Sequence, residues 1–123
     1  NMTEKRFTDD HEWAELDGEV VTVGITDYAQ GQLGDIVYVE LPDVGRTIDQ
    51  GEETAVVESV KAAGDVKSPV TGKIVEVNDV LADEPSKVNE DPQGDGWFFK
   101  IKASDPSQMA DYMDEAAYKT FIG

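Results

Sequence analysis

A lysine in the middle of the chain stands where turn chemistry alone would not select one. Residues 58–72 have the sequence ESVKAAGDVKSPVTG, which predicts a strand, a short turn and a returning strand. Lys61 falls at the tip of this predicted hairpin, a place that usually holds Asn, Asp or Gly. Because its neighbours Val60 and Ala62 are uncharged, we expect the ε-amine to project into solvent, where acylation would attach a group and remove the positive charge.

An ordinary solvated lysine is the competing interpretation, since the chain has eight lysines and most surface lysines only keep a protein soluble. Cysteine is absent and His11 is the only histidine, so we expect no nucleophile–base pair and no Cys-based metal site. Adjacent acids such as Asp9-Asp10 and Glu52-Glu53 arise by chance among 27 acidic residues, and their spacing does not fit an EF-hand loop. We therefore predict neither a catalytic nor a metal site.

The composition predicts a single acidic domain over residues 1–123, since domains typically have about 100 to 150 residues. The formal net charge of −17 would repel the phosphate backbone of a nucleic acid. This charge either only solvates the surface or steers the protein toward partners with basic docking patches. No apolar run approaches the roughly 18 to 20 residues that a membrane span needs. We expect a monomer that binds neither nucleic acid nor membrane.

The elements that must position Lys61 are mainly strands. Short β-favouring runs separated by turn residues predict an all-β-dominated fold, with a β core over about 20–102, rather than βαβ units. The five predicted strands are 18–25, 36–41, 54–60, 73–78 and 97–102. In two of them the expected inward side chains are Val37, Val39 and Leu41, and Trp97, Phe99 and Ile101.

Three helices are predicted around these strands. Thr26 caps a short helix that runs through Leu33 and ends at Gly34, and Pro85 suits the first position of another before residue 89. Asp105 and Pro106 open a C-terminal helix over about 106–119. Its expected apolar stripe is Met109, Tyr112, Met113, Ala116 and Ala117.

The segment around Lys61 resembles the attachment sites of lipoyl and biotinyl carrier domains, in which the modified lysine occupies such a tip. The matching residues are Glu58-Ser59-Val60-Lys61-Ala62, Ser68-Pro69 and Gly72. Lipoyl domains of 2-oxoacid dehydrogenases typically have Asp before the lysine, and biotin carriers have flanking methionines, whereas this chain has Val60 and Ala62. The flanks resemble the H-protein family of the glycine cleavage system from about Phe7 to Tyr118. Its motifs are His11-Glu12-Trp13, GITDYAQGQLGDIVYVELP over 24–42, Val88-Asn89-Glu90-Asp91-Pro92 and GWFFKI over 96–101.

This resemblance implies a barrel-sandwich hybrid fold and a carrier that is not an enzyme. Lys61 would bear lipoic acid in amide linkage, and the arm would shuttle the aminomethyl group of glycine between enzymes. The implied partners are a PLP-dependent glycine decarboxylase (P protein), an aminomethyltransferase (T protein), a dihydrolipoamide dehydrogenase (L protein) that takes the electrons, and lipoylating enzymes. A lipoyl relay or interaction module and a biotin carrier domain remain as alternatives.

The resemblance also implies a cleft that shields the loaded arm from water. Its residues would include Glu12, Ile25 and Ala29, with Glu12 as a partner for the amine of the cargo. The family often carries a histidine where this chain has Gln32, and glutamine cannot titrate. The family is cytosolic in bacteria and mitochondrial in eukaryotes, so we expect a bacterial cytoplasm or, for a mature eukaryotic form, a mitochondrion.

Overall fold

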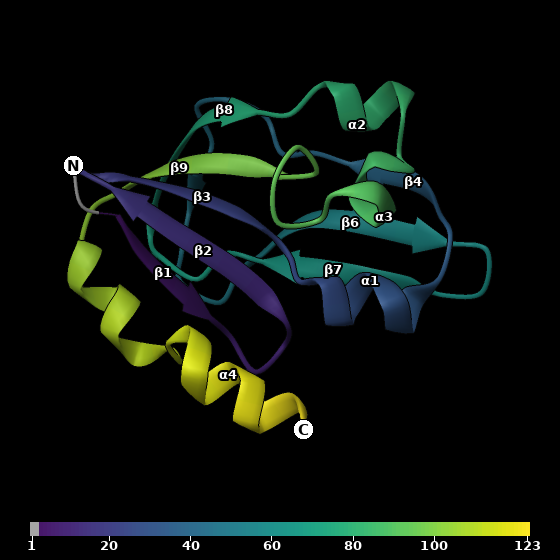
Figure 1. Cartoon of the computed structure of the whole chain (residues 1–123). Coiled ribbons are helices and arrows are strands. Elements are labelled where there is room, and N and C mark those ends of the chain that lie inside the picture. Colours follow the sequence, from purple (N-terminus) through teal and green to yellow (C-terminus); the bar gives the residue numbers. More distant parts are fainter. Residues whose placement is uncertain (1–2) are drawn as a thin grey trace.

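Residues 3–123, which the computed structural model describes, form two β-sheets with short helices along their margins (Figure 1). The strands are β1 (Glu4–Phe7), β2 (Glu12–Asp17), β3 (Val20–Ile25), β4 (Ile36–Glu40), β5 (Thr47–Ile48), β6 (Glu53–Ser59), β7 (Ala63–Lys67), β8 (Gly72–Val77) and β9 (Phe99–Ala103). One sheet has the order β1-β2-β3-β9-β8-β5 and the other β4-β6-β7, with antiparallel pairing throughout. The predicted all-β-dominated sandwich is confirmed, and neither sheet of this described part closes into a barrel.

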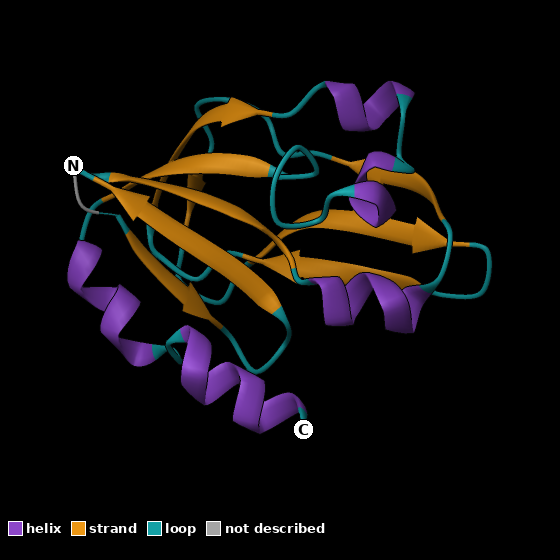
Figure 2. Ribbon diagram, viewed as in Figure 1, coloured by secondary structure: helices purple, strands orange, loops and turns teal. Residues whose placement is uncertain are grey.

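One apolar core joins the two sheets. The large sheet contributes Val21, Val23 and Ile101 to it, and the small sheet contributes Val57 and Val66. Each of these side chains is at most 2 % exposed. Full burial of such a side chain contributes roughly 1.5–3 kcal/mol, so the core holds the β6–β7 hairpin firmly against the large sheet. The helices lie outside these layers, as Figure 2 shows.

The strand predicted over 36–41 is β4, but one side chain that was expected to face the core faces solvent. The register of β4 on β6 shifts between Ile36 and Tyr38, so that Val37 is the extra residue of a bulge. Ile36 and Val39 are buried, whereas Val37 is 55 % exposed. The prediction that Val37 shares the inward face with Val39 is therefore wrong, because the bulge interrupts the alternation.

The last strand also departs from the expected alternation. β9 begins at Phe99 rather than at Trp97, and Phe98 is completely buried beside it. Trp97 is only partly buried, and the Lys100 amine lies 5.0 Å from the centroid of its ring. Phe99 and Ile101 face the core as predicted. The inward placement of Trp97 is wrong because the strand has not yet begun at that residue.

A second apolar cluster fixes the N-terminal hairpin. Phe7, Trp13 and Tyr118 are buried together, and the Trp13 indole donates a hydrogen bond of 2.9 Å to the Pro92 carbonyl. The indole lies flat on β3 at Gly24, where a Cβ atom would be 2.7 Å from its ring nitrogen. Glycine is therefore required at this position of the strand by the close approach of the ring.

The short helices of the middle of the chain are α1 (Asp27–Leu33), α2 (Val80–Asp83) and α3 (Lys87–Glu90). As predicted, Thr26 caps α1 and Gly34 follows it, with a φ of 85° that favours glycine. The predicted role of Pro85 is wrong, because α3 begins at Lys87 with Ser86 as its N-cap. Pro85 instead lies in the turn that joins α2 to α3.

The C-terminal helix predicted over about 106–119 is two helices, a 3-10 helix η1 (Pro106–Asp111) and α4 (Glu115–Ile122). Asp105 caps η1 as predicted, through a hydrogen bond to the Ser107 amide. The chain then extends, and Met113 forms a β-bridge with Phe7. Asp114 then caps α4, which begins at Glu115. The faces of α4 therefore differ from those of one continuous helix, and Tyr118 is its buried residue. The predicted stripe is thus wrong at Ala116 and Ala117, which are exposed.

Candidate functional site

The turn that joins β6 to β7 consists of residues 59–62 and carries Lys61. The Ser59 amide donates a hydrogen bond of 2.7 Å to the Ala62 carbonyl and closes the turn. The Ser59 hydroxyl oxygen accepts hydrogen bonds from the amides of Lys61 and Ala62, at 3.2 and 3.0 Å. A serine therefore shapes the turn where Asn or Gly usually would, which leaves the tip position free for a long side chain.

The turn is tied to the neighbouring strand, while the Lys61 side chain is left exposed. The Val60 amide donates a hydrogen bond of 3.0 Å to the Asp35 carbonyl, just before β4. Within residues 3–123, no hydrogen bond or ion pair engages the Lys61 amine. The lysine Cε atom lies 3.5 Å from where a Cβ atom on Gly34 would be, so its aliphatic part passes beside the end of α1. The amine is thus accessible, as the sequence predicts.

A cleft of about 360 Å³ lies between α1 and the β6–β7 hairpin. We call it the arm cleft. The three residues that the sequence analysis assigned to a cleft, Glu12, Ile25 and Ala29, all line it, although they come from β2, β3 and α1. Gln32 lines the same cleft. Gly64, three residues after Lys61, also lines it, so the arm cleft begins close to the turn.

Glu12 places a buried carboxyl group in the arm cleft. The residue is only 3 % exposed. Its carboxylate accepts a hydrogen bond of 2.5 Å from the Thr8 hydroxyl and one of 3.3 Å from the Lys67 amide. Burial raises the pKa of the Glu12 carboxyl above its ordinary value, although these two hydrogen bonds partly lower it. A cationic group that entered the cleft would compensate this buried charge.

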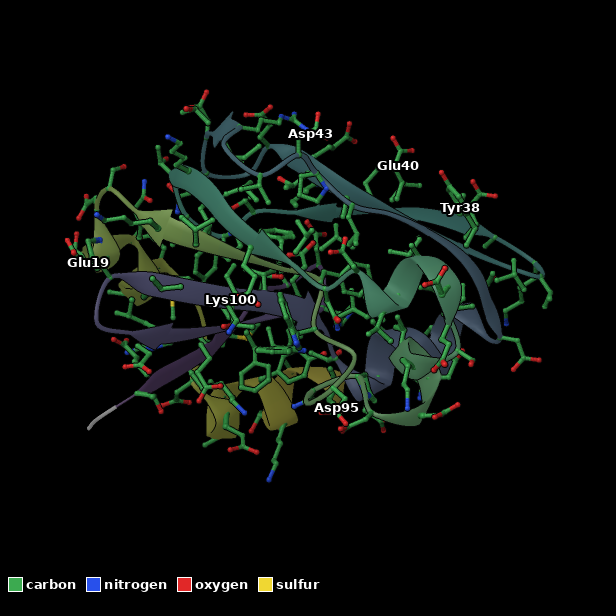
Figure 3. The ribbon with its side chains drawn as sticks, turned by 90° about the horizontal axis from the view of Figure 1, so that it is seen from above. Glu19, Tyr38, Glu40, Asp43, Asp95 and Lys100 are labelled. Carbon is green, nitrogen blue, oxygen red and sulfur yellow. The ribbon has the colours of Figure 1, made fainter. Side chains whose placement is uncertain are left out.

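Two more carboxylates, those of Asp10 and Asp65, line the arm cleft. Asp10 forms an exposed ion pair with the Lys67 amine at 3.2 Å. The remaining acidic side chains are spread over the whole surface, and those labelled in Figure 3 point outward from separate elements. The cleft is therefore lined by three acidic residues in a protein of net charge −17, which favours cationic over anionic contents.

His11 lies next to Glu12 in the arm cleft, a placement that the sequence analysis missed. It directly precedes β2, and its φ of 70° is the only positive value of a non-glycine residue in the described chain. Its Nδ1 atom lies 2.8 Å from the Tyr118 hydroxyl, which is also 2.7 Å from the Thr26 hydroxyl. No local pattern could reveal this network, because Tyr118 is 107 residues away from His11.

Asn89 is a second residue that sequence reasoning did not assign. Its side-chain amide donates hydrogen bonds to the Gly34 carbonyl at 2.9 Å and to Gln30 at 2.8 Å. Its oxygen accepts one of 2.9 Å from the Ile36 amide. The side chain thus joins the end of α1 to the start of β4. Asn89 belongs to the Val88–Pro92 motif, which was the one sequence signal that it has a role. The motif does not reveal its hydrogen bonds to α1 and β4.

Two other kinds of feature, a metal-binding cluster and a membrane-spanning helix, are not found among the described residues. Residues 3–123 contain no group of three or more His, Asp or Glu side chains arranged to hold a metal ion. None of the helices in this range combines the length and apolar character that crossing a lipid bilayer requires.

Comparison with known proteins gives a consistent result over nearly the whole chain. A family model described as glycine cleavage H-protein matches residues 5–123. The glycine cleavage system H proteins of Parvibaculum lavamentivorans and Bradyrhizobium diazoefficiens are 56 % and 60 % identical to this chain, over 98 % and 96 % of it and 97 % of each relative. A crystal structure of a glycine cleavage system H protein from Mycobacterium marinum superposes with a TM-score of 0.89 at 36 % identity, covering 98 % of this chain and 97 % of that one.

Proposed function

Because this chain belongs to the glycine cleavage H-protein family, whose members are carriers in the glycine cleavage system and not its enzymes, we propose that Lys61 bears lipoic acid in amide linkage. The observation that carries the proposal is the exposed Lys61 amine at the end of a cleft that holds a buried carboxyl group. The covalent group would supply the disulfide that accepts the aminomethyl group of glycine and the dithiol that passes electrons on.

The residues around Lys61 fit such a group. The amine is exposed and bound to nothing else in the described chain, so a modifying enzyme can reach it. The lysine side chain already passes beside Gly34, at the end of α1. Ile25 and Ala29 offer apolar surface for an alkyl chain, and the turn itself is fixed by Ser59.

Glu12 has the properties of a recognition group for the amine of the cargo. Its carboxylate is desolvated, so a protonated amine nearby would interact with it more strongly than in water. The hydrogen bonds from Thr8 and Lys67 fix its orientation before any cargo arrives. Apolar side chains such as Ile25 and Ala29 line the cleft with it, and they would limit the access of water to an aminomethyl group.

The exposed turn suits a carrier that several enzymes must reach. Its proposed partners are a PLP-dependent glycine decarboxylase, an aminomethyltransferase, a dihydrolipoamide dehydrogenase and the lipoylating enzymes. The net charge of −17 supports docking on basic patches of these partners. We also propose that residues 1–123 work as one carrier domain. The relatives compared above are bacterial, which supports a bacterial cytoplasm as its compartment.

Intact-mass spectrometry of the protein from cells with an active lipoylation pathway tests the proposal. The wild type should gain the mass of one lipoyl group, and Lys61→Ala should not gain it. Lys73→Ala is the matched control, because Lys73 is also exposed but lies on β8, away from the turn. An unmodified wild type beside a modified control carrier in the same cells would refute the assignment of Lys61, and a biotin adduct would favour a biotin carrier.

A further inference from the structure

Helix α1 forms one wall of the arm cleft but has no fully buried side chain. Only Ala29 and Leu33 pack partly against the core. A helix of seven residues is too short to be stable alone, because helices below about 12 residues are marginal in water. Besides this partial packing, the position of the wall therefore depends on contacts at its two ends.

The N-terminal end of α1 is held from the C-terminal helix. The Thr26 hydroxyl accepts a hydrogen bond of 3.2 Å from the Ala29 amide and lies 2.7 Å from the Tyr118 hydroxyl. The same Tyr118 hydroxyl lies 2.8 Å from Nδ1 of His11. The Tyr118 ring stacks on Phe7 with centroids 4.8 Å apart and an interplanar angle of 13°. Its hydroxyl is therefore fixed at the cap of α1 by packing elsewhere.

The C-terminal end of α1 is held by Asn89. Both protons of its amide group are used, one toward Gly34 and one toward Gln30, and its oxygen binds the Ile36 amide. Val88, next to it in α3, is completely buried and anchors that helix. Asn89 thus connects α1 to a rigid part of the molecule.

We propose that Tyr118 and Asn89 are positioning residues that clamp α1 at both ends and thereby set the opening of the arm cleft. Neither side chain lines the cleft, so neither can act by touching its contents. When one clamp is lost, α1 moves away from the hairpin more often and water enters the cleft. The proposal rests on the proposed carrier function, because the opening matters only where the cleft protects an arm.

Hydrogen exchange on the unmodified protein tests the clamps without any lipoyl group. Tyr118→Phe keeps the ring on Phe7 and removes the hydroxyl, and Asn89→Asp keeps the shape but turns an oxygen toward the Gly34 carbonyl. The amides of Gln30 and Gly34, which bond within α1, should exchange about fivefold faster, the factor that one lost hydrogen bond of ~1 kcal/mol gives.

Two matched variants control for a general loss of stability. Tyr112→Phe removes a hydroxyl that donates a hydrogen bond of 2.7 Å to the Pro69 carbonyl. Asn78→Asp disturbs an amide that donates to the carbonyls of Asp95 and Trp97, both at 2.8 Å. The α1 amides should exchange at wild-type rates in both controls. Unchanged exchange in Tyr118→Phe and Asn89→Asp, or equal acceleration in the controls, would overturn the clamps.

Loss of cargo from the lipoylated protein tests the consequence. After loading by glycine decarboxylase and removal of that enzyme, hydrolysis of the aminomethyl cargo would break its carbon–sulfur bond, consume one water and release formaldehyde and ammonia, leaving the arm as the free dithiol. Formaldehyde should appear about fivefold faster from each clamp variant than from the wild type and from the two controls. If a variant with faster α1 exchange releases formaldehyde at the wild-type rate, the clamps do not control the opening of the arm cleft. If Lys61 gains no lipoyl group, the proposed function fails, and hydrogen exchange still decides whether the clamps hold α1.

Discussion

The turn that carries Lys61 and the arm cleft beside it are built in different ways. The turn is closed by four consecutive residues, and Ser59 alone supplies its side-chain hydrogen bonds. The cleft takes its lining from β2, β3, α1, β6 and β7, and α1 is held by side chains from α3 and α4. A proposed attachment site encoded in one short segment thus lies beside a cleft that depends on the whole fold. Changes to the turn should leave the fold intact, whereas changes around the cleft should affect both.

Replacing the lysine gives the largest expected effect on function and the smallest on the fold. Lys61→Arg keeps the positive charge but removes the amine that can form an amide. Lipoylation, measured by intact mass, should be lost completely, while the thermal midpoint should match that of the wild type. A large fall in the midpoint would show that the turn is not independent of the fold.

Gly24→Ala should have the opposite effect, a loss of stability without a change to the turn. The added Cβ atom would lie 2.7 Å from the Trp13 ring nitrogen, and such overpacking costs about 2 kcal/mol. Urea unfolding at fixed pH measures the loss. Gly31→Ala is the matched control, since a Cβ atom there would have no atom of residues 3–123 within 4 Å. Because Gly31 lies inside α1, the control should be more stable than the wild type, by roughly 0.5–1 kcal/mol.

Glu12→Gln should separate the charge of the cleft from its shape. Folding raises the pKa of Glu12 above its ordinary 4.5, so the folded protein holds this proton more tightly than the unfolded chain does. The ionised carboxylate therefore destabilises the fold at pH values above the raised pKa, and this effect disappears as the pH falls toward 4.5. The variant should have a higher thermal midpoint than the wild type at neutral pH, and the difference should shrink on acidification.

A constant difference between the Glu12→Gln variant and the wild type from neutral pH down to 4.5 would contradict this explanation. Asp65→Asn serves as the control, because Asp65 also lines the cleft but is exposed, and such a surface substitution should change the thermal midpoint little. The aminomethyl cargo should be lost faster from lipoylated Glu12→Gln than from the wild type, since the counter-charge for its amine is gone.

Ser59→Ala should produce the smallest effect. It removes the oxygen that accepts hydrogen bonds from the amides of Lys61 and Ala62, but both amides are exposed and water can replace it. The loss in unfolding free energy should be about 0.5 kcal/mol. Lipoylation under limiting ligase should slow through a higher KM with kcat unchanged. A change in kcat would instead show that the turn takes part in the enzyme's active site.

The same contrast explains what the sequence could predict. The hairpin, the tip position of Lys61 and the cap at Thr26 depend on residues close in the chain, and local patterns predicted them. Glu12, Ile25 and Ala29 were assigned by resemblance alone, and the structure brings them together at one cleft. Their roles toward an arm stay predictions.

The wrong predictions concern features that depend on contacts between distant segments, and local sequence patterns do not contain this information. The bulge at Val37 depends on the register of β4 against β6, which periodicity within β4 cannot specify. The C-terminal helix is interrupted because Met113 pairs with Phe7, more than 100 residues earlier. The contacts of Asn89 and Tyr118 with α1 likewise join segments distant in the chain. A single sequence gives the residue types of such contacts but not their partners.

The aromatic stack of Phe7 on Tyr118 has a consequence for the synthesis of the protein. A ribosome makes the N-terminal hairpin long before it makes α4. Phe7 and Trp13 therefore lack their aromatic partner Tyr118 until the rest of the chain has been made. During that interval Thr26 can accept its hydrogen bond from the Ala29 amide, whereas the contact of its hydroxyl with Tyr118 cannot form. A nascent chain therefore presents Lys61 before both of the contacts that we propose to hold α1 can be made.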